Sequence, residues 1–163
     1  MQFEGLVNIK APREKVWEFL TSPEFVSQCA PGVRSVDVVT PDKQFKAVAV
    51  VGFGSAKVTF QADVEWMEMY PGRYARMKAH GNTPGSGVDV ISEMRLTSQG
   101  GTTNLNWKAE ISVVGSLAST AARLMEGVTR NLTKAFFDCV RGKIEVEDQP
   151  ADGRAAEGAV EAA

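Results

Sequence analysis

The feature that most constrains the fold is one long amphipathic segment near the C-terminus, residues 116–141 (SLASTAARLMEGVTRNLTKAFFDCVR). At 100° per residue, its apolar side chains fall within an arc of about 120°. They are Leu117, Ala121, Leu124, Met125, Val128, Leu132, Ala135, Phe136 and Cys139. About 26 residues at 1.5 Å each predict a helix roughly 39 Å long, capped by Ser116 and ended by Gly142.

The opposite face of this helix carries charge. Glu126 and Arg130, and likewise Lys134 and Asp138, are opposite charges four residues apart, so this face is predicted to contact water. The apolar stripe is too long for one helix to bury alone. It needs a broad apolar surface as its partner.

The residues before the helix alternate between apolar and polar side chains, as antiparallel strands do. The clearest alternation covers residues 56–66. The expected strands are residues 2–10, 33–40, 45–53, 56–66, 74–80, 88–96 and 103–113. Two short helices, opened by Pro12 and by Ser22 with Pro23, are expected after the first strand, and residues 82–87 are expected to form a flexible loop.

This order of elements predicts an α+β fold of the helix-grip type. A curved seven-stranded antiparallel sheet would wrap its apolar face around the long C-terminal helix. The domain is expected to cover residues 1–144. Residues 145–163 are acidic and poor in large apolar side chains, so they are expected to form a disordered tail.

Composition excludes several classes of protein. No run approaches the roughly 20 apolar residues that span a membrane, and the N-terminus does not resemble a signal peptide. A cytoplasmic location is therefore expected. The net charge of −2 includes no basic cluster that would indicate a nucleic-acid partner.

The sequence contains no recognisable catalytic set or metal site. His80 is the only histidine, and it is either a rim side chain or a general base whose orienting partner the sequence does not identify. Cys29 and Cys139 lack CxxC spacing, which argues against a disulfide framework and a zinc site. Cys29 is expected to be an unactivated thiol and Cys139 a packed core side chain.

Small residues stand at many inward positions of the predicted sheet and helix, where a tight core would use large ones. They are Ala47, Ala49, Ala56, Ala62, Ala75, Ala79, Ala109, Ala121 and Ala135. An empty void of roughly 300 Å³ would cost on the order of 7 kcal/mol, against a total stability of about 5–15 kcal/mol. Either large aromatic side chains fill this space, or an apolar ligand occupies it. The pattern alone leaves both interpretations open.

Several motifs, in this order and at these spacings, resemble the CoxG family of carbon monoxide dehydrogenase subunits, within the START/Bet v 1-like (SRPBCC) superfamily. The resemblance covers roughly residues 1–144. The motifs are the segment APREKVWEFLTSPEFVSQCAPGV after the first strand, the Cys29–Val33 loop, the Val51–Gly54 turn, the GNTPGSGV loop, and Gly115-Ser116-Leu117 leading into a helix that contains Phe136-Phe137.

The resemblance implies a non-catalytic protein with a hydrophobic cavity. It implies a bound quinone, menaquinone or ubiquinone, and a CO dehydrogenase-type molybdenum hydroxylase as the partner, which the protein would supply with an electron acceptor or recruit to the membrane. Family members often carry a C-terminal anchor. The acidic tail here would repel anionic lipid, so the expected membrane contact is transient and peripheral, at the inner face of the cell membrane.

The predicted ligand-binding residues act through shape and desolvation. They are Phe45, Ala49, Val58, Phe60, Ala62, Met77, Val90, Trp107, Ala109, Ala121, Leu124, Met125 and Val128. The cavity mouth is expected between two glycine-bearing loops, at Pro31, Gly32, Gly85 and Gly87. Two other functions stay open: an assembly factor that acts through its surface, and a small cyclase or hydrolase.

Overall fold

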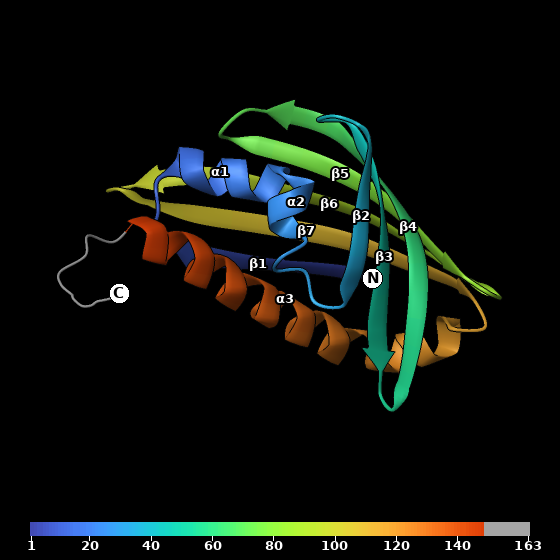
Figure 1. The fold of residues 1–163 in the computed structure, drawn as a ribbon. Helices are drawn as coiled ribbons and strands as arrows, with labels where there is room; N and C mark the ends of the chain where they lie inside the picture. The colour runs from blue at the N-terminus through green and yellow to red at the C-terminus, as the bar shows by residue number, and fades with distance from the viewer. Residues whose placement is uncertain (149–163) are drawn as a thin grey trace.

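The computed structural model of the protein describes residues 1–148. Its elements are β1 (Gln2–Ile9), α1 (Arg13–Thr21), α2 (Pro23–Val26), β2 (Val33–Thr40), β3 (Gln44–Phe53), β4 (Ala56–Tyr70), β5 (Tyr74–Thr83), β6 (Ser86–Gln99), β7 (Thr102–Gly115) and α3 (Ala118–Asp148). The seven strands form one antiparallel sheet in the order β1-β7-β6-β5-β4-β3-β2. The curved sheet grips α3 (Figure 1), which confirms the predicted α+β helix-grip fold.

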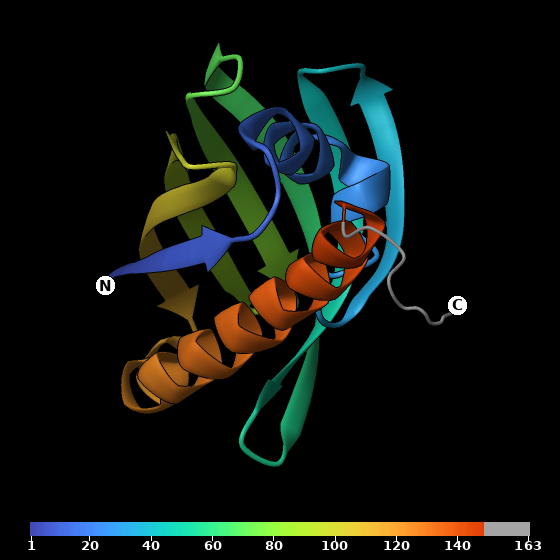
Figure 2. The ribbon, with the colours of Figure 1, turned by 90° about the vertical axis from the view of Figure 1, so that its left-hand side faces the viewer.

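The helices lie on one side of the sheet. Figure 2 shows α3 running across the concave face, while α1 and α2 cover one end of it. The β3–β4 hairpin extends at the other end, near the start of α3. A layer of helix on one face leaves the other face of the sheet to water.

The alternation in β4 produces this two-sided sheet. Phe60 and Val64 are each 7% exposed on the concave face, while the intervening Gln61 and Asp63 are exposed. On the outer face, charged side chains pair across strands, as in the Lys46–Asp63 ion pair at 3.3 Å. Register is therefore set by apolar burial on one face and by charge pairing on the other.

Helix α3 is longer than the sequence predicts. It continues through Gly142 to Asp148, because Ile144, 2% exposed, packs in the core beyond that glycine. The Lys10 amide also donates to the Glu145 carboxylate at 2.7 Å. Residues 145–148 are thus helical rather than disordered, and the rest of the predicted tail lies outside the described residues.

Two further expectations about α3 are wrong. Ser116 does not cap the start of α3. The Leu117 amide instead donates to the Ser86 hydroxyl of β6, 3.0 Å away. Ala135 is exposed rather than part of the buried stripe.

Within residues 1–148, no helix combines the length and the apolar character that a membrane crossing requires.

The glycine-bearing segment at residues 82–87 is a tight hairpin, not a flexible loop. Asn82 pairs with Gly87 and Thr83 with Ser86, so Pro84 and Gly85 alone form the turn. Gly85 has a φ of 80°, a left-handed conformation that glycine adopts without steric cost. The strands therefore continue almost to the tip of this segment.

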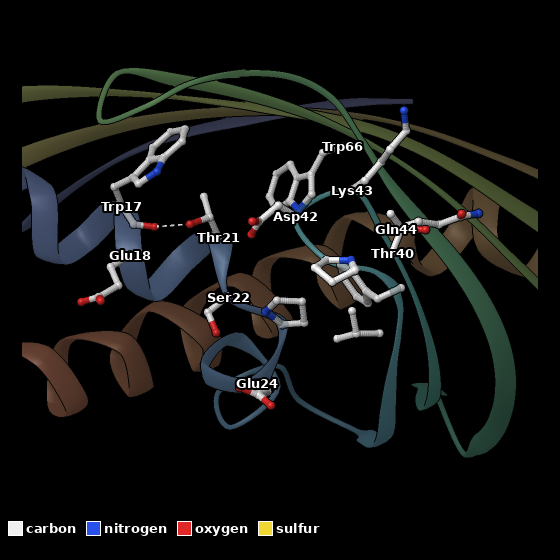
Figure 3. A pocket seen from close by; sticks show the side chains of 14 residues that line it. Trp17, Glu18, Thr21, Ser22, Glu24, Thr40, Asp42, Lys43, Gln44 and Trp66 are labelled. Atoms are coloured by element: carbon white, nitrogen blue, oxygen red, sulfur yellow. Dashed lines mark hydrogen bonds between the residues drawn. The ribbon is translucent and has the colours of Figure 1, made fainter.

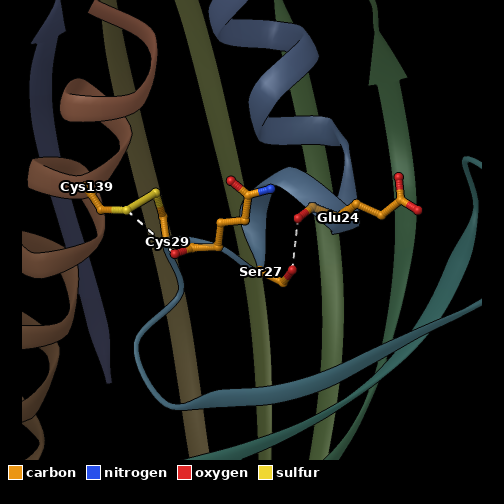
Figure 4. The surroundings of a disulfide bond; sticks show 5 residues. Glu24, Ser27, Cys29 and Cys139 are labelled. Carbon is orange, nitrogen blue, oxygen red and sulfur yellow. Dashed lines mark hydrogen bonds between the residues drawn. A yellow bond between two sulfur atoms is a disulfide. The ribbon is translucent and has the colours of Figure 1, made fainter. Parts of the chain in front are cut away.

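The expectation of two unpaired cysteines is also wrong. Cys29, in the loop after α2, forms a disulfide with Cys139 of α3, with their Cα atoms 5.4 Å apart (Figure 4). The two residues are 110 positions apart in sequence, and only the fold brings them together. The bond joins the end of the α1–α2 segment to the long helix.

Buried apolar side chains form two separate clusters. The α1-end core contains Ile9, Ala11, Val16, Phe19, Leu20, Cys29, Leu96, Leu105, Val140 and Ile144. The hairpin-end core contains Phe53, Phe60, Ala121 and Met125. The space between sheet and helix from one cluster to the other is where a cavity can form.

Candidate functional site

The largest apolar hollow, the large chamber, lies between the concave face of the sheet and α3. Its volume is about 450 Å³. It is lined by Ala49, Val51, Phe53, Phe60, Ala62, Ala79, Gly81, Val88, Val90, Trp107, Ala109, Ile111, Met125, Val128, Thr129, Leu132, Thr133, Phe136 and Phe137. None of these side chains is ionisable, so the chamber suits an uncharged, mainly hydrocarbon ligand.

The large chamber exists because small residues stand side by side on neighbouring strands. Ala62 of β4 pairs with Ala47 of β3 and with Gly81 of β5. Cross-strand partners share a face of the sheet, so this row has almost no side-chain volume facing α3. The alanine pattern in the sequence thus corresponds to a real hollow.

A second hollow, the small chamber, lies nearer to α1 and α2. Its volume is about 240 Å³. It is lined by Leu20, Pro23, Val26, Phe45, Val64, Trp66, Ala75, Met77, Ser92, Glu93, Met94, Leu105, Trp107, Lys108, Phe136 and Phe137. The small chamber is therefore mainly apolar, with one charged pair of residues, Glu93 and Lys108, among those that line it.

Three aromatic side chains separate the chambers. Trp107, Phe136 and Phe137 line both of them. The Trp107 indole lies over Gly5 of β1, where a Cβ atom would come within 2.6 Å of its Nε1. Gly5 therefore leaves the room that the indole occupies.

The structure brings most of the predicted ligand-binding residues to these chambers. The large chamber takes Ala49, Phe60, Ala62, Val90, Trp107, Ala109, Met125 and Val128. Phe45 and Met77 line the small chamber. Val58, Ala121 and Leu124 line neither, because they pack in and against the hairpin-end core.

The predicted mouth residues lie elsewhere. Pro31, Gly32, Gly85 and Gly87 line neither chamber. The Gly32 carbonyl accepts a hydrogen bond from the Val50 amide at 2.8 Å, and the Gly85 carbonyl accepts one from Ser116 at 3.0 Å. Both loops are thus tied to neighbouring backbone.

The predicted ligand-binding set missed five lining residues of α3. Leu132 and Phe136 belong to the predicted apolar stripe, whereas Thr129, Thr133 and Phe137 lie outside it. These last three follow Met125 at four-residue intervals, beside the apolar stripe rather than within it. The face of α3 that borders the chamber is therefore a wider arc than the predicted apolar stripe. Thr129 and Thr133 were not included in the predicted stripe, because a polar residue is normally assigned to the water-facing side of a helix.

A third hollow, the polar groove, opens between α1–α2 and the β2–β3 turn (Figure 3). Its volume is about 450 Å³. It is lined by Trp17, Glu18, Thr21, Ser22, Pro23, Glu24, Val38, Thr40, Pro41, Asp42, Lys43, Gln44, Phe45 and Trp66. No sequence pattern indicates this groove, because its two sides come from segments that are separate along the chain.

The structure supplies the histidine partner that the sequence did not identify. His80 Nδ1 lies 2.7 Å from Asp89 Oδ1, and both side chains are about half exposed. The neighbours Ala79 and Gly81 line the large chamber, so His80 points to the opposite face of the sheet. In residues 1–148, no group of three or more potential metal ligands gathers.

Comparison with known proteins identifies the family. The sequence profile of CoxG, a carbon monoxide dehydrogenase subunit, matches residues 5–145. The chain belongs to the CoxG family. No curated protein matches this CoxG chain significantly.

Solved structures share the fold of this CoxG protein. A conserved protein from Geobacillus kaustophilus superposes with a TM-score of 0.83 and 23% identity, over 90% of this chain and 97% of the other. The Zhui aromatase/cyclase from Streptomyces sp. R1128 superposes with a TM-score of 0.70 and 18% identity, over 98% and 99%. The helix-grip fold of this chain is thus shared with both proteins.

Proposed function

We propose that this CoxG protein is a non-catalytic carrier whose chambers hold an isoprenoid quinone, menaquinone or ubiquinone. Its partner would be a CO dehydrogenase-type molybdenum hydroxylase, which it supplies with an electron acceptor or recruits to the membrane by transient contact. The observation that carries the proposal is the pair of adjoining apolar chambers. Their volumes of about 450 and 240 Å³ fall together in the usual range for small-molecule sites, about 300–1,000 Å³.

The lining favours an apolar occupant. Water in the large chamber finds almost no polar side chain to bond with, since Thr129 and Thr133 alone carry hydroxyls among the lining residues. A hydrocarbon tail displaces this water, covers apolar side chains and meets no ionisable group there.

The direct test is organic extraction of the purified protein combined with native mass spectrometry. We expect a quinone to be released, and the double substitution Ala62→Phe with Ala109→Phe to abolish its retention while the fold persists. Gln61→Phe, on the exposed face of β4, is the matched control and should retain the ligand. Recovery of the hydroxylase in a pull-down, without any extractable ligand, would favour an assembly role instead.

A cytoplasmic location is part of the same proposal. The Cys29–Cys139 disulfide counts against it, because disulfides rarely persist in a reducing cytosol. Alkylation of free thiols in freshly lysed cells decides the matter. Full protection of both cysteines from alkylation would indicate that the protein is in an oxidising compartment.

A further inference from the structure

The three hollows form a continuous row rather than isolated sites. Pro23, Phe45 and Trp66 line both the polar groove and the small chamber. Trp107, Phe136 and Phe137 line both the small and the large chamber. Each neighbouring pair thus shares part of its wall, and side chains in such a wall can change rotamer to let a ligand pass.

The two ends of this row differ in polarity. The only hydroxyl side chains that line the large chamber are Thr129 and Thr133, and the Thr133 hydroxyl already donates to the Thr129 carbonyl at 2.8 Å. The groove is lined by side chains that can donate hydrogen bonds: the Trp17 and Trp66 indoles and the Ser22 and Thr40 hydroxyls. Because an unpaired buried carbonyl is costly, a ligand's polar group is better satisfied in the groove.

We propose that the ligand lies lengthwise, with its polar head in the groove and its apolar tail passing through the small chamber into the large one. This orientation rests on the proposed function, since it presumes that the chambers hold a ligand. It defines the ligand class as a long-chain amphiphile with a hydrogen-bonding head. The groove is then the end from which a partner reaches the head.

The charge around the groove specifies the head further. Glu18, Glu24 and Asp42 are acidic, against the single base Lys43. This excess of carboxylates repels an anionic head such as that of a fatty acid, and leaves a neutral carbonyl or hydroxyl free to pair with the Trp17 indole or the Thr40 hydroxyl. The site therefore selects uncharged amphiphiles.

The test compares a short-tailed and a long-tailed ubiquinone, titrated by quenching of tryptophan fluorescence. Filling the groove with Thr40→Trp should weaken both ligands about tenfold, because both place their heads there. Filling the large chamber with Ala62→Phe should weaken only the long-tailed ligand, because the short tail ends in the small chamber. Ala109→Phe serves the same purpose should Ala62→Phe not fold.

Matched controls lie one residue away. Val39→Trp and Gln61→Phe place the same bulk on side chains that line neither the groove nor a chamber, and both should bind like wild type. The orientation is overturned if Ala62→Phe weakens the short-tailed ligand while Thr40→Trp weakens neither. Failure of the wild-type protein to bind either quinone removes the proposed function, and the orientation with it.

A second arm tests head charge with palmitate and hexadecanol, which share a chain length. Wild type should bind the alcohol about tenfold more tightly than the carboxylate. Asp42→Asn should narrow this gap, and asparagine tolerates the positive φ of 60° at this position. Equal binding of both lipids by wild type would refute the selection for an uncharged head.

Discussion

The α1-end core contains large side chains that are fully buried, and the hairpin-end core contains none. Ile9 and Val140 at the α1 end are 0% exposed. Phe60 and Met125 at the hairpin end remain 7% and 6% exposed, because the large chamber lies directly against them. The same sheet and the same helix thus enclose large side chains completely at one end, beside the small chamber, and form the wall of the large chamber at the other.

Polar contacts reinforce the α1 end. The buried Thr103 hydroxyl donates to the Ala11 carbonyl at 2.8 Å, and the Arg141 guanidinium donates to the Asn8 carbonyl at 3.3 Å. At the hairpin end, the Leu117 and Ser116 amides bond the tip of the β5–β6 hairpin. Helix α3 is therefore attached at both ends and stands away from the sheet between them, where the chambers lie.

The disulfide should give the largest contrast between the two ends. It closes a separation of 110 residues, and in the chain-entropy account a loop of that length contributes about 5 kcal/mol to the free energy of unfolding. We expect reduction with a phosphine to remove this amount in urea titrations. Hydrogen exchange should accelerate first in α1 and α2, and faster exchange confined to the β3–β4 hairpin would contradict the assignment of this bond to the α1 end.

A local sequence pattern could not have predicted that bond. Cys29 and Cys139 carry no spacing signal, and only the fold brings the loop after α2 beside α3. The same holds for the polar groove, where Trp17 and Asp42 meet across the fold. The prediction that α3 ends at Gly142 was wrong for an energetic reason. A glycine within a helix costs about 1 kcal/mol, which is less than the burial of Ile144 contributes.

The alternation of the strands and the positions of small residues in the sheet could be predicted from the sequence. Alternation over β4 located Phe60 and Val64 on the concave face, because the two faces of a strand lie in different environments. Ala49, Ala62 and Ala109 line the large chamber, although the alanine pattern alone left a core filled by aromatic side chains equally open. The position of the mouth was not predictable, since a glycine marks a turn equally well whether or not a ligand passes it.

The second largest effect should come from truncating matched side chains in the two cores. Ile9→Ala removes packed atoms from a fully buried site and should cost about 3 kcal/mol. Met125→Ala removes a side chain of equal atom count that already borders the large chamber, so a loss at the low end of the range for such truncations, about 2 kcal/mol, is expected. Urea unfolding of both variants, each without bound ligand, gives the comparison. A loss for Met125→Ala as large as that for Ile9→Ala would show that the protein's own side chains pack around Met125 and leave no chamber beside it.

A smaller effect is expected where β1 meets Trp107. Gly5→Ala places a methyl group within 2.6 Å of the indole, and this overpacking should cost about 1–2 kcal/mol and change the fluorescence of Trp107. Gly52→Ala is the control, because a Cβ there meets nothing within 4 Å. An unchanged emission spectrum for Gly5→Ala would mean that the indole does not rest on β1.

The smallest effect concerns the water-facing side of α3 beside the α1 end. The Asp138 carboxylate accepts a hydrogen bond from Lys134 at 2.7 Å, and this bond, assisted by the Lys134 and Arg141 charges, lowers the pKa of Asp138. A lowered pKa in the folded state means that the ionised carboxylate stabilises the fold above its ordinary pKa, and that this contribution disappears as the pH falls through the folded-state value.

Asp138→Asn should therefore lower the urea midpoint slightly at neutral pH and leave it unchanged in acid. Because the carboxylate is exposed, salt should shrink the difference at neutral pH as well. Glu126→Gln, which removes the Arg130 partner at 3.3 Å on the hairpin half of the helix, is the matched control. A larger loss for Glu126→Gln than for Asp138→Asn would place the stronger surface pairing at the hollow end, against the contrast drawn between the two ends.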